Sequence, residues 1–240
     1  LATTFRKTQL PFIALLFSAI EHPLKTCGIV ALISLLGKRQ VIYPDSTMSE
    51  VQSTFRLRPG DIAPGFHLPD PGGKIHSLAG LQGDQGTLVI FACNHCPYVI
   101  HLAEAVGRLA EEIASAGIKT VAIMSNDVEN YPDDHPDLMG SFAAESGWAF
   151  PYLYDENQEV AKAWSAACTP DFFLLDGGNA LFYSGQFDSA RPGNGGKVTG
   201  SDLRLAVDGL MAGGPPPENP FPSSGCNIKW KAGNEPVYFG

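Results

Sequence analysis

The run TLVIFACNHCPYVI at residues 87–100 joins a predicted strand to a predicted helix. Its first six residues are continuously apolar, which is typical of a central strand covered on both faces. The apolar residues that follow recur at helical spacing as far as Ile113, and Gly117 predicts the end of the helix. Cys93 and Cys96 therefore stand between the strand and the first turn of the helix.

Further patterns on both sides of this run predict an α/β domain. They indicate a hairpin joining 66–68 to 74–76, a strand at 120–124, helices at 136–145 and 160–164, a hairpin joining 172–175 to 180–183, and a last helix over 203–211. Asp155 with Gln158 resembles a capping box for the second of these helices, and Ser201 is expected to cap the last one. Alternating strands and helices predict parallel crossovers, and the closing hairpin adds antiparallel strands, so the central sheet should be mixed.

Changes in composition divide the chain into four parts. We expect an N-terminal extension at 1–47, a linker at 48–59, a folded domain at 60–214 and a C-terminal tail at 215–240. Consecutive prolines open that tail, and proline cannot continue a helix. The tail itself carries few signals of a packed core.

The extension at 1–47 contains two apolar runs, Pro11–Ile20 and Cys27–Gly37. Each is about ten residues long, shorter than the roughly 20 residues that cross a bilayer. Arg6 and Lys7 resemble the basic start of a signal peptide, but no clean cleavage pattern follows. The segment is a poor signal or anchor, a membrane hairpin, or an extension outside the folded protein. We favour the last interpretation and a cytoplasmic location, with an exported or membrane-anchored protein as the alternative.

Composition limits the classes of partner. The 240 residues carry a formal net charge of −9, and 44% of them are hydrophobic. This apolar content excludes a largely disordered chain. The excess of acidic residues argues against nucleic-acid binding, which needs a positively charged surface. Five cysteines are too few for a disulfide-rich secreted scaffold. We therefore expect no nucleic-acid partner, and a membrane partner only if the extension is a genuine anchor.

The C-x-x-C pair of Cys93 and Cys96 is the strongest functional signal. The N–H groups and partial positive charge at a helix N-terminus favour a thiolate over a thiol. A second sulfur one helical turn away can close a disulfide with the first and release a bound partner. His95 adds a donor that should lower the pKa of Cys93, and Pro97 suits the first helical turn.

The same cysteines also allow a metal site. Zinc would need Cys93, Cys96, His101 and a remote Cys168 or Cys226, and copper would use the cysteine pair with a nearby histidine. The sequence has no second C-x-x-C pair and no histidines at zinc-finger spacing. We therefore expect neither a metal nor another cofactor, and a metal-binding module stays as an alternative function.

Residues in the C-terminal half of the chain are further candidates for the site around the cysteine pair. Thr169-Pro170 precedes a predicted strand, so its peptide bond is either cis or the ordinary bond before a strand-start proline. Cys168 fits a buried apolar position better than a redox thiol. Cys226 lies in the tail, where it is either an exposed resolving thiol or part of a tail that packs back.

Several motifs together resemble one known family. They are Ala63-Pro64-x-Phe66-x-Leu68, the run Cys93–Val99, the run Cys168–Phe173 and the tail motif Gly225–Lys231. From about residue 60 to 231 the chain resembles the thioredoxin-like redoxins of the alkyl hydroperoxide reductase and thiol-specific antioxidant superfamily, in their peroxiredoxin-like branch. The resemblance implies a thioredoxin fold, Cys93 as the attacking cysteine, Cys96 as its partner and Pro170 as a cis-proline facing the disulfide. Exposed backbone near Thr169 would then pair with an extended substrate strand.

Departures from the family pattern decide between two activities. A typical peroxiredoxin has Thr or Ser three residues before its peroxidatic cysteine, where this chain has Ile90. The arginine of such enzymes has no clear counterpart, and Thr87 stands where thioredoxin has a buried acid. We therefore expect a thiol–disulfide oxidoreductase acting on a protein disulfide or dithiol, with an unidentified electron donor. A thiol peroxidase that reduces hydroperoxides is the alternative.

Overall fold

The computed structural model describes residues 49–239. The interpretations offered for the extension at 1–47 therefore lie outside the described residues. Within the described part of the chain, no helix combines the length and the apolarity that crossing a bilayer requires.

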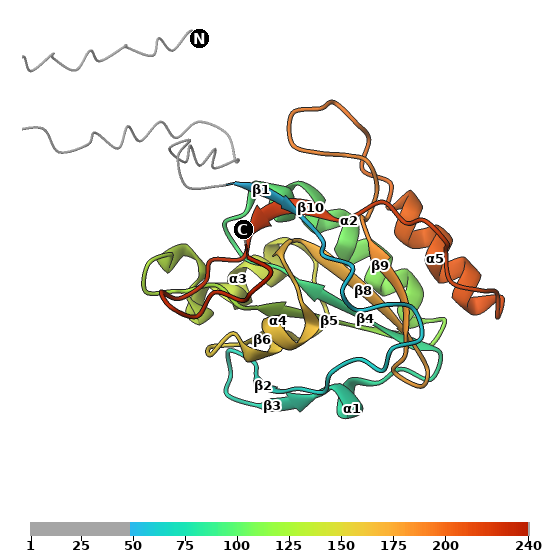
Figure 1. The fold of residues 1–240 in the computed structure, drawn as a ribbon, viewed down its shortest axis with the longest axis horizontal. Helices are drawn as coiled ribbons and strands as arrows, with labels where there is room; N and C mark the ends of the chain where they lie inside the picture. The colour runs from blue at the N-terminus through green and yellow to red at the C-terminus, as the bar shows by residue number, and fades with distance from the viewer. Residues whose placement is uncertain (1–48, 240) are drawn as a thin grey trace, which may run out of the picture. The chain divides into compact units, whose positions relative to one another are not determined.

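A five-stranded mixed sheet forms the centre of the domain (Figure 1). Its spatial order is β6 (Tyr152–Tyr154), β5 (Ile118–Met124), β4 (Gly86–Phe91), β8 (Asp171–Asp176) and β9 (Leu181–Gly185). β4 pairs parallel with β5 and antiparallel with β8, which confirms the predicted mixed sheet. Every residue of β4 is buried, because both faces of the sheet are covered.

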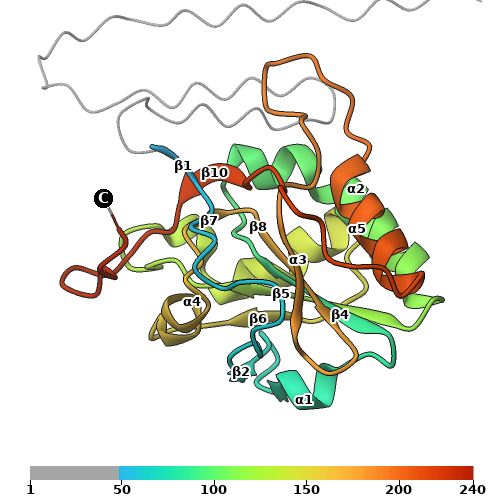
Figure 2. The ribbon, with the colours of Figure 1, turned by 45° about the vertical axis from the view of Figure 1, so that its right-hand side comes forward.

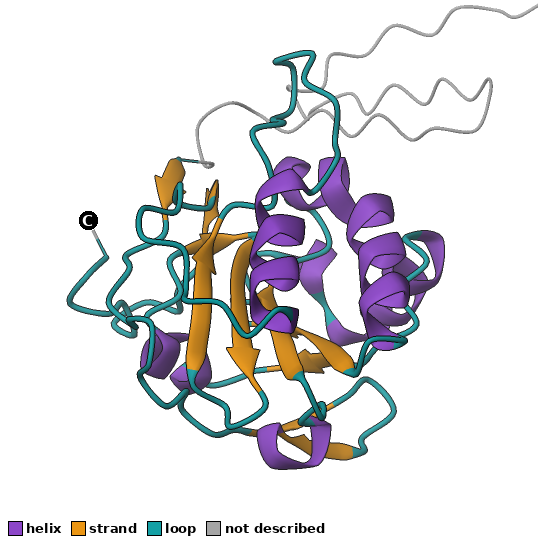
Figure 3. Ribbon diagram, turned by 90° about the vertical axis from the view of Figure 1, so that its right-hand side faces the viewer, coloured by secondary structure: helices purple, strands orange, loops and turns teal. Residues whose placement is uncertain are grey.

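Helices and a hairpin form the layers on the two faces (Figure 3). The helices are α1 (Leu78–Leu81), α2 (Pro97–Ala114), α3 (Pro136–Glu145), α4 (Glu159–Trp164), α5 (Ser201–Met211) and the short 3-10 helix η1 (Pro132–Asp134), and the hairpin strands are β2 (His67–Pro69) and β3 (Ile75–Ser77). Leu88 and Ile90 of β4 belong to a core shared with α2, α3 and α5. Val89 and Phe91 face the opposite way, toward α1, α4 and β2. The predicted helices and both hairpins are confirmed.

A second, smaller sheet joins the two ends of the described chain (Figure 2). β1 (Glu50–Gln52), β10 (Ser224–Asn227) and β7 (Cys168–Thr169) pair antiparallel in that order. Ile228 and Trp230, just after β10, are buried in the core. The segments expected as a linker at 48–59 and a tail at 215–240 thus each contribute a strand. Strands this short contain too few residues to show a periodic pattern in the sequence.

Two helix starts differ from the predicted caps. Gln158 does not complete a capping box: it precedes α4 with φ 62°, and its amide donates to two backbone carbonyls. Asp155 nevertheless accepts hydrogen bonds from two N–H groups of α4. Ser201 is the first residue of α5, and the capping position is Gly200, whose φ of 69° suits glycine.

Candidate functional site

The cysteine pair lies at the strand–helix junction that the sequence predicts. Cys93 follows the end of β4, and Cys96 is the N-cap residue of α2, with Pro97 in the first turn. Both side chains are buried, with exposed fractions of 1% for Cys93 and 0% for Cys96. The pair is therefore placed as expected but covered by other parts of the domain.

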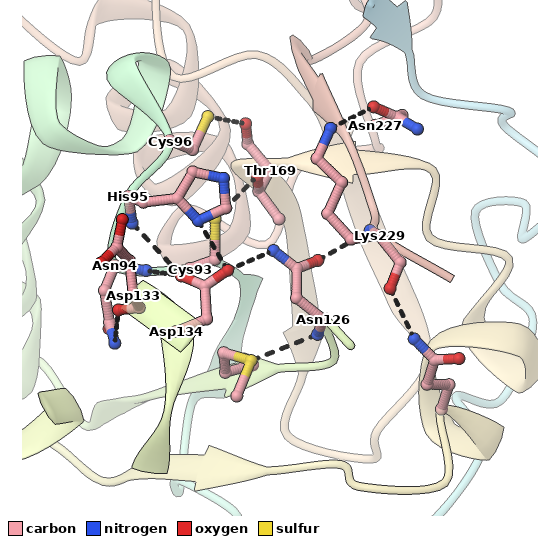
Figure 4. Close-up of polar contacts among 12 residues, drawn as sticks. Cys93, Asn94, His95, Cys96, Asn126, Asp133, Asp134, Thr169, Asn227 and Lys229 are labelled. Atoms are coloured by element: carbon pink, nitrogen blue, oxygen red, sulfur yellow. Dashed lines mark hydrogen bonds and ion pairs between the residues drawn. The ribbon is translucent and has the colours of Figure 1, made fainter. Parts of the chain in front are cut away.

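The two sulfur atoms converge on Thr169 (Figure 4). Cys93 Sγ lies 3.4 Å from the Thr169 hydroxyl oxygen, and Cys96 Sγ lies 3.1 Å from the Thr169 carbonyl oxygen, to which it donates when it is protonated. The two thiols also share a hydrogen bond with each other. The bond between Thr169 and Pro170 is cis, as the sequence position suggested. No disulfide links Cys93, Cys96, Cys168 or Cys226.

A buried carboxylate, Asp134, lies beside the pair. Its Oδ2 atom is 2.7 Å from His95 Nδ1 and accepts from the Asn126 amide at 2.8 Å. Its Oδ1 atom accepts from the backbone N–H groups of Asn94 and His95. Sequence reasoning missed Asp134 because η1 is brought to the C-x-x-C loop only by folding, and no spacing rule connects them.

The imidazole of His95 is held by Asp134, whose Oδ2 atom lies 2.7 Å from His95 Nδ1. Burial alone would lower the pKa of His95, but the hydrogen bond and negative charge of Asp134 outweigh it and raise the pKa. The ring also stacks on Tyr131, with centroids 5.9 Å apart and planes 7° from parallel. His95 thus pairs with a buried anion that lies beside Cys93.

The order of the thiol pKa values differs from the expectation. Burial, the hydrogen bond to Cys96 and the charge of Asp134 raise the pKa of Cys93. Burial would also raise the pKa of Cys96, but hydrogen bonds donated by Cys226, Cys93 and the Thr169 hydroxyl outweigh it and lower the pKa. The prediction of a low-pKa Cys93 is therefore wrong. Cys96, not Cys93, caps the helix, and the hydrogen bond between the two sulfurs means that they titrate as a pair.

The other two cysteines of the described chain are buried nearby. Cys226 is only 2% exposed and lies on β10, where it pairs across strands with Thr169. The interpretation of Cys226 as an exposed tail thiol is therefore wrong, because the tail packs back onto the domain. Cys168 is fully buried on β7, and its thiol lies 3.5 Å from the Pro170 carbonyl oxygen. Burial and the nearby charge of Asp171 raise the pKa of Cys168.

The backbone next to Thr169 is already paired. β10 runs antiparallel to β7, with Cys226 opposite Thr169 and Asn227 opposite Cys168. The expectation of exposed backbone ready for an extended substrate strand is therefore corrected: a strand of the same chain occupies that edge.

Three side chains near the pair have the chemistry of metal ligands. One ligand atom each from Cys93, His95 and Asp134 lie within 4.8 Å of one another. The sets expected from the sequence combined Cys93 and Cys96 with His95 or His101, whereas this set lacks Cys96 and His101 and includes Asp134. Both oxygens of Asp134 are already engaged by neighbouring donors, so the carboxylate is satisfied by the protein itself.

A second buried carboxyl group, Asp171, ties the small sheet to the central one. Its oxygens accept from the Ser53 hydroxyl at 2.7 Å and from the Ala167 N–H at 3.3 Å. Burial raises the pKa of Asp171 to about 6. The sequence shows Asp171 only as one residue of the run Cys168–Phe173. A linear pattern does not reveal that a strand residue buries its carboxyl group.

Comparison with solved structures identifies close relatives of the whole domain. An uncharacterized conserved protein from Geobacillus kaustophilus is 47% identical, covering 77% of this chain and 97% of its own, with a TM-score of 0.74. A hypothetical protein from Sinorhizobium meliloti 1021 is 46% identical, with a TM-score of 0.73. The match covers 75% of this chain and 98% of that protein. The fold is shared with a putative thiol:disulfide interchange protein DsbE from Chlorobium tepidum, at 19% identity and a TM-score of 0.52. The match covers 65% of this chain and 99% of that protein. The thioredoxin fold expected from the sequence is confirmed.

Curated relatives and a family model add the biochemical class. A protein named as a putative peroxiredoxin from Mycobacterium tuberculosis is 32% identical over 113 residues, covering 47% of this chain and 67% of that protein. Peroxiredoxin Bcp from Escherichia coli K12 is 27% identical over 106 residues, which cover 44% of this chain and 63% of that protein. The AhpC/TSA family model matches residues 59–183. The expected class, an oxidoreductase acting on thiol groups, is confirmed, and the chain belongs to the AhpC/TSA family.

Proposed function

We propose that this protein is a thiol–disulfide oxidoreductase that cycles Cys93 and Cys96 between dithiol and disulfide. The observation that carries the proposal is the convergence of both sulfurs on Thr169, at 3.4 and 3.1 Å. The hydrogen bond between the two thiols supports it further, because a disulfide closes only between sulfurs that already lie side by side. Closing the Cys93–Cys96 disulfide then needs rotation of side chains alone.

The first step makes Cys93 the attacking atom. As Cys93 Sγ attacks one sulfur of a partner disulfide, its proton passes along the hydrogen bond to the Cys96 sulfur. A mixed disulfide forms, and the other partner sulfur leaves as a thiolate. A thiol whose pKa is raised can react in this way because Cys96, whose pKa is lowered, acts as its base.

The second step releases the partner. Cys96 Sγ attacks Cys93 Sγ and the mixed disulfide breaks. The proton of Cys96 passes to one partner thiolate, and the other partner thiolate takes its proton from solvent. The balance is one partner disulfide reduced to two thiols and one Cys93–Cys96 disulfide formed. The reverse sequence oxidises a partner dithiol, so direction depends on the reduction potentials of the two couples.

Access to the sulfurs depends on the segments that cover them. With exposed fractions of 1% and 0%, neither cysteine meets a partner in the closed arrangement. Reaction therefore requires local opening of a covering segment, such as the small sheet at β7 and β10, with a free energy below that of global unfolding.

The proposal is tested by disulfide reduction with a defined set of variants. Cys93→Ser is expected to abolish reduction of a protein disulfide, and Cys96→Ser is expected to accumulate a mixed disulfide with the substrate. Cys168→Ser, a matched change of a buried cysteine outside the pair, should retain the wild-type rate if its melting temperature is unchanged. Full activity of Cys93→Ser would contradict the mechanism.

Reduction of hydroperoxides is the second candidate activity, favoured by the relatives named as peroxiredoxins. Cys93 would attack the terminal peroxide oxygen, releasing an alcohol or water and becoming a sulfenic acid, and Cys96 would condense with it to form the disulfide and water. Ile90 offers no hydroxyl, but the Thr169 hydroxyl lies 3.4 Å from Cys93 Sγ. Peroxide consumption that falls in Thr169→Val, with protein-disulfide reduction preserved, would support this activity; equal loss of both would argue against it.

A further inference from the structure

β10 fills the strand-pairing edge beside the cysteine pair (Figure 2). Extended peptides commonly bind a protein by adding a strand to an open sheet edge. Here the edge of β7 is taken by a segment of the same chain, and β1 covers the outer edge of that segment. The strand next to the dithiol is therefore tethered rather than delivered by a partner.

Cys226 is the β10 residue that comes to the dithiol. It pairs with Thr169, the residue that contacts both sulfurs of the pair. Its thiol shares a hydrogen bond with the Cys96 sulfur, and the three cysteines belong to one buried core. Cα atoms of α2 and β10 also approach within 8 Å.

The close approach of β10 is built into the sequence. A Cβ atom on Gly225 would lie 2.1 Å from the Thr169 carbonyl oxygen and 2.8 Å from its carbonyl carbon. Only glycine lets the strand come this near to β7, because any side chain would collide with backbone. After the strand, Asn126 accepts from the Lys229 N–H at 2.8 Å while its amide donates to Asp134 (Figure 4). Both ends of the contact are thus held against the site.

We propose that Cys226 is a third redox cysteine, which exchanges with the Cys93–Cys96 disulfide at the Cys96 sulfur. The proposal rests on the disulfide of the proposed function. The Cys226 thiol attacks Cys96 Sγ, a Cys96–Cys226 bond forms, and the Cys93–Cys96 bond breaks. Cys93 leaves as a thiolate and takes up the proton that Cys226 gives up. One disulfide moves, so no outside oxidant or reductant is consumed.

The exchange changes both the redox state of Cys93 and the freedom of β10 to move. It returns Cys93 to the thiol form, while the disulfide is now held between Cys96 and Cys226. The Cys96–Cys226 bond also clamps β10 to the start of α2, so the covering strand is fixed in this oxidised form. Reduction of that bond frees the strand again.

Peptide mapping of the full chain tests the proposal. The protein is equilibrated in an oxidising glutathione buffer, quenched with acid, alkylated and digested with trypsin. Cys93 and Cys96 share peptide 75–108, Cys226 lies in 205–229 and Cys168 in 163–197. We expect a cross-linked species of 75–108 with 205–229, with fragment ions that place the bond on Cys96, and more of it in Cys93→Ser.

The controls separate this proposal from the proposed function. Cys168→Ser should leave the cross-link unchanged, and Cys226→Ser should still close the Cys93–Cys96 disulfide. If Cys93→Ser keeps both Cys96 and Cys226 fully alkylated in a buffer that oxidises wild-type protein, the third-cysteine proposal is overturned. If Cys226→Ser fails to close the first disulfide although it is folded, the proposed function itself is wrong.

Discussion

Substitution of Gly225 by alanine tests whether β10 covers the dithiol. The new Cβ atom would stand 2.1 Å from the Thr169 carbonyl oxygen, so either β10 or β7 must move. Overpacking of this kind typically costs about 1–3 kcal/mol. If lifting β10 relieves the collision, that free energy raises the open population by roughly 5- to 150-fold.

Alkylation of the reduced protein measures that opening. The rate at which a neutral alkylating agent modifies peptide 75–108 should rise in Gly225→Ala by the same factor, because the sulfurs react only from the open form. Gly65→Ala is the matched control, since a Cβ atom there meets nothing within 4 Å. Equal rates in the two variants, with a lower melting temperature only in Gly225→Ala, would refute the reasoning, since the strain would then be relieved elsewhere.

Three further predictions concern the charges and ligands of the site. Asp134→Asn should lower the pKa of Cys93, since it removes the adjacent negative charge, and the ultraviolet absorbance of the thiolate should appear at lower pH than in wild type. Asp171 has a pKa raised from 3.8 to about 6, so the folded state binds its proton more tightly than the unfolded state and loses stability as pH rises between these values. Relative to Asp171→Asn, urea unfolding should show wild type losing about 3 kcal/mol across that window, and a pH-independent difference would contradict the assignment. Reduced protein that is exposed to zinc and then dialysed should keep no stoichiometric metal, because neighbouring donors satisfy Asp134. Stoichiometric zinc that is retained by wild type and lost in His95→Ala would show that these residues form a metal site.

The sequence predicts the elements whose pattern is long and local. The apolar run of β4 and the periodic face of α2 are continuous in the chain, so these two patterns alone place Cys93 and Cys96 at one junction. The same holds for the two hairpins, whose turn residues lie between their strands.

The parts that the sequence misses depend on contacts between distant segments. β10 and β7 have four and two residues, too few to show a period, and their pairing joins positions far apart in the chain. Asp134 reaches His95 only because η1 folds over the C-x-x-C loop. The order of the thiol pKa values then follows from these two contacts, since Asp134 disfavours an anion at Cys93 and Cys226 donates to Cys96.

A redox titration of the Cys226→Ser variant tests the central claim most directly. The variant is equilibrated at graded ratios of reduced to oxidised glutathione, and the alkylated thiols of peptide 75–108 are counted by mass. The account predicts that Cys93 and Cys96 lose their thiols together, in one two-electron transition that removes two hydrogens. Persistence of both alkylated thiols across the range, or a stable glutathione adduct on one cysteine without closure, would contradict it.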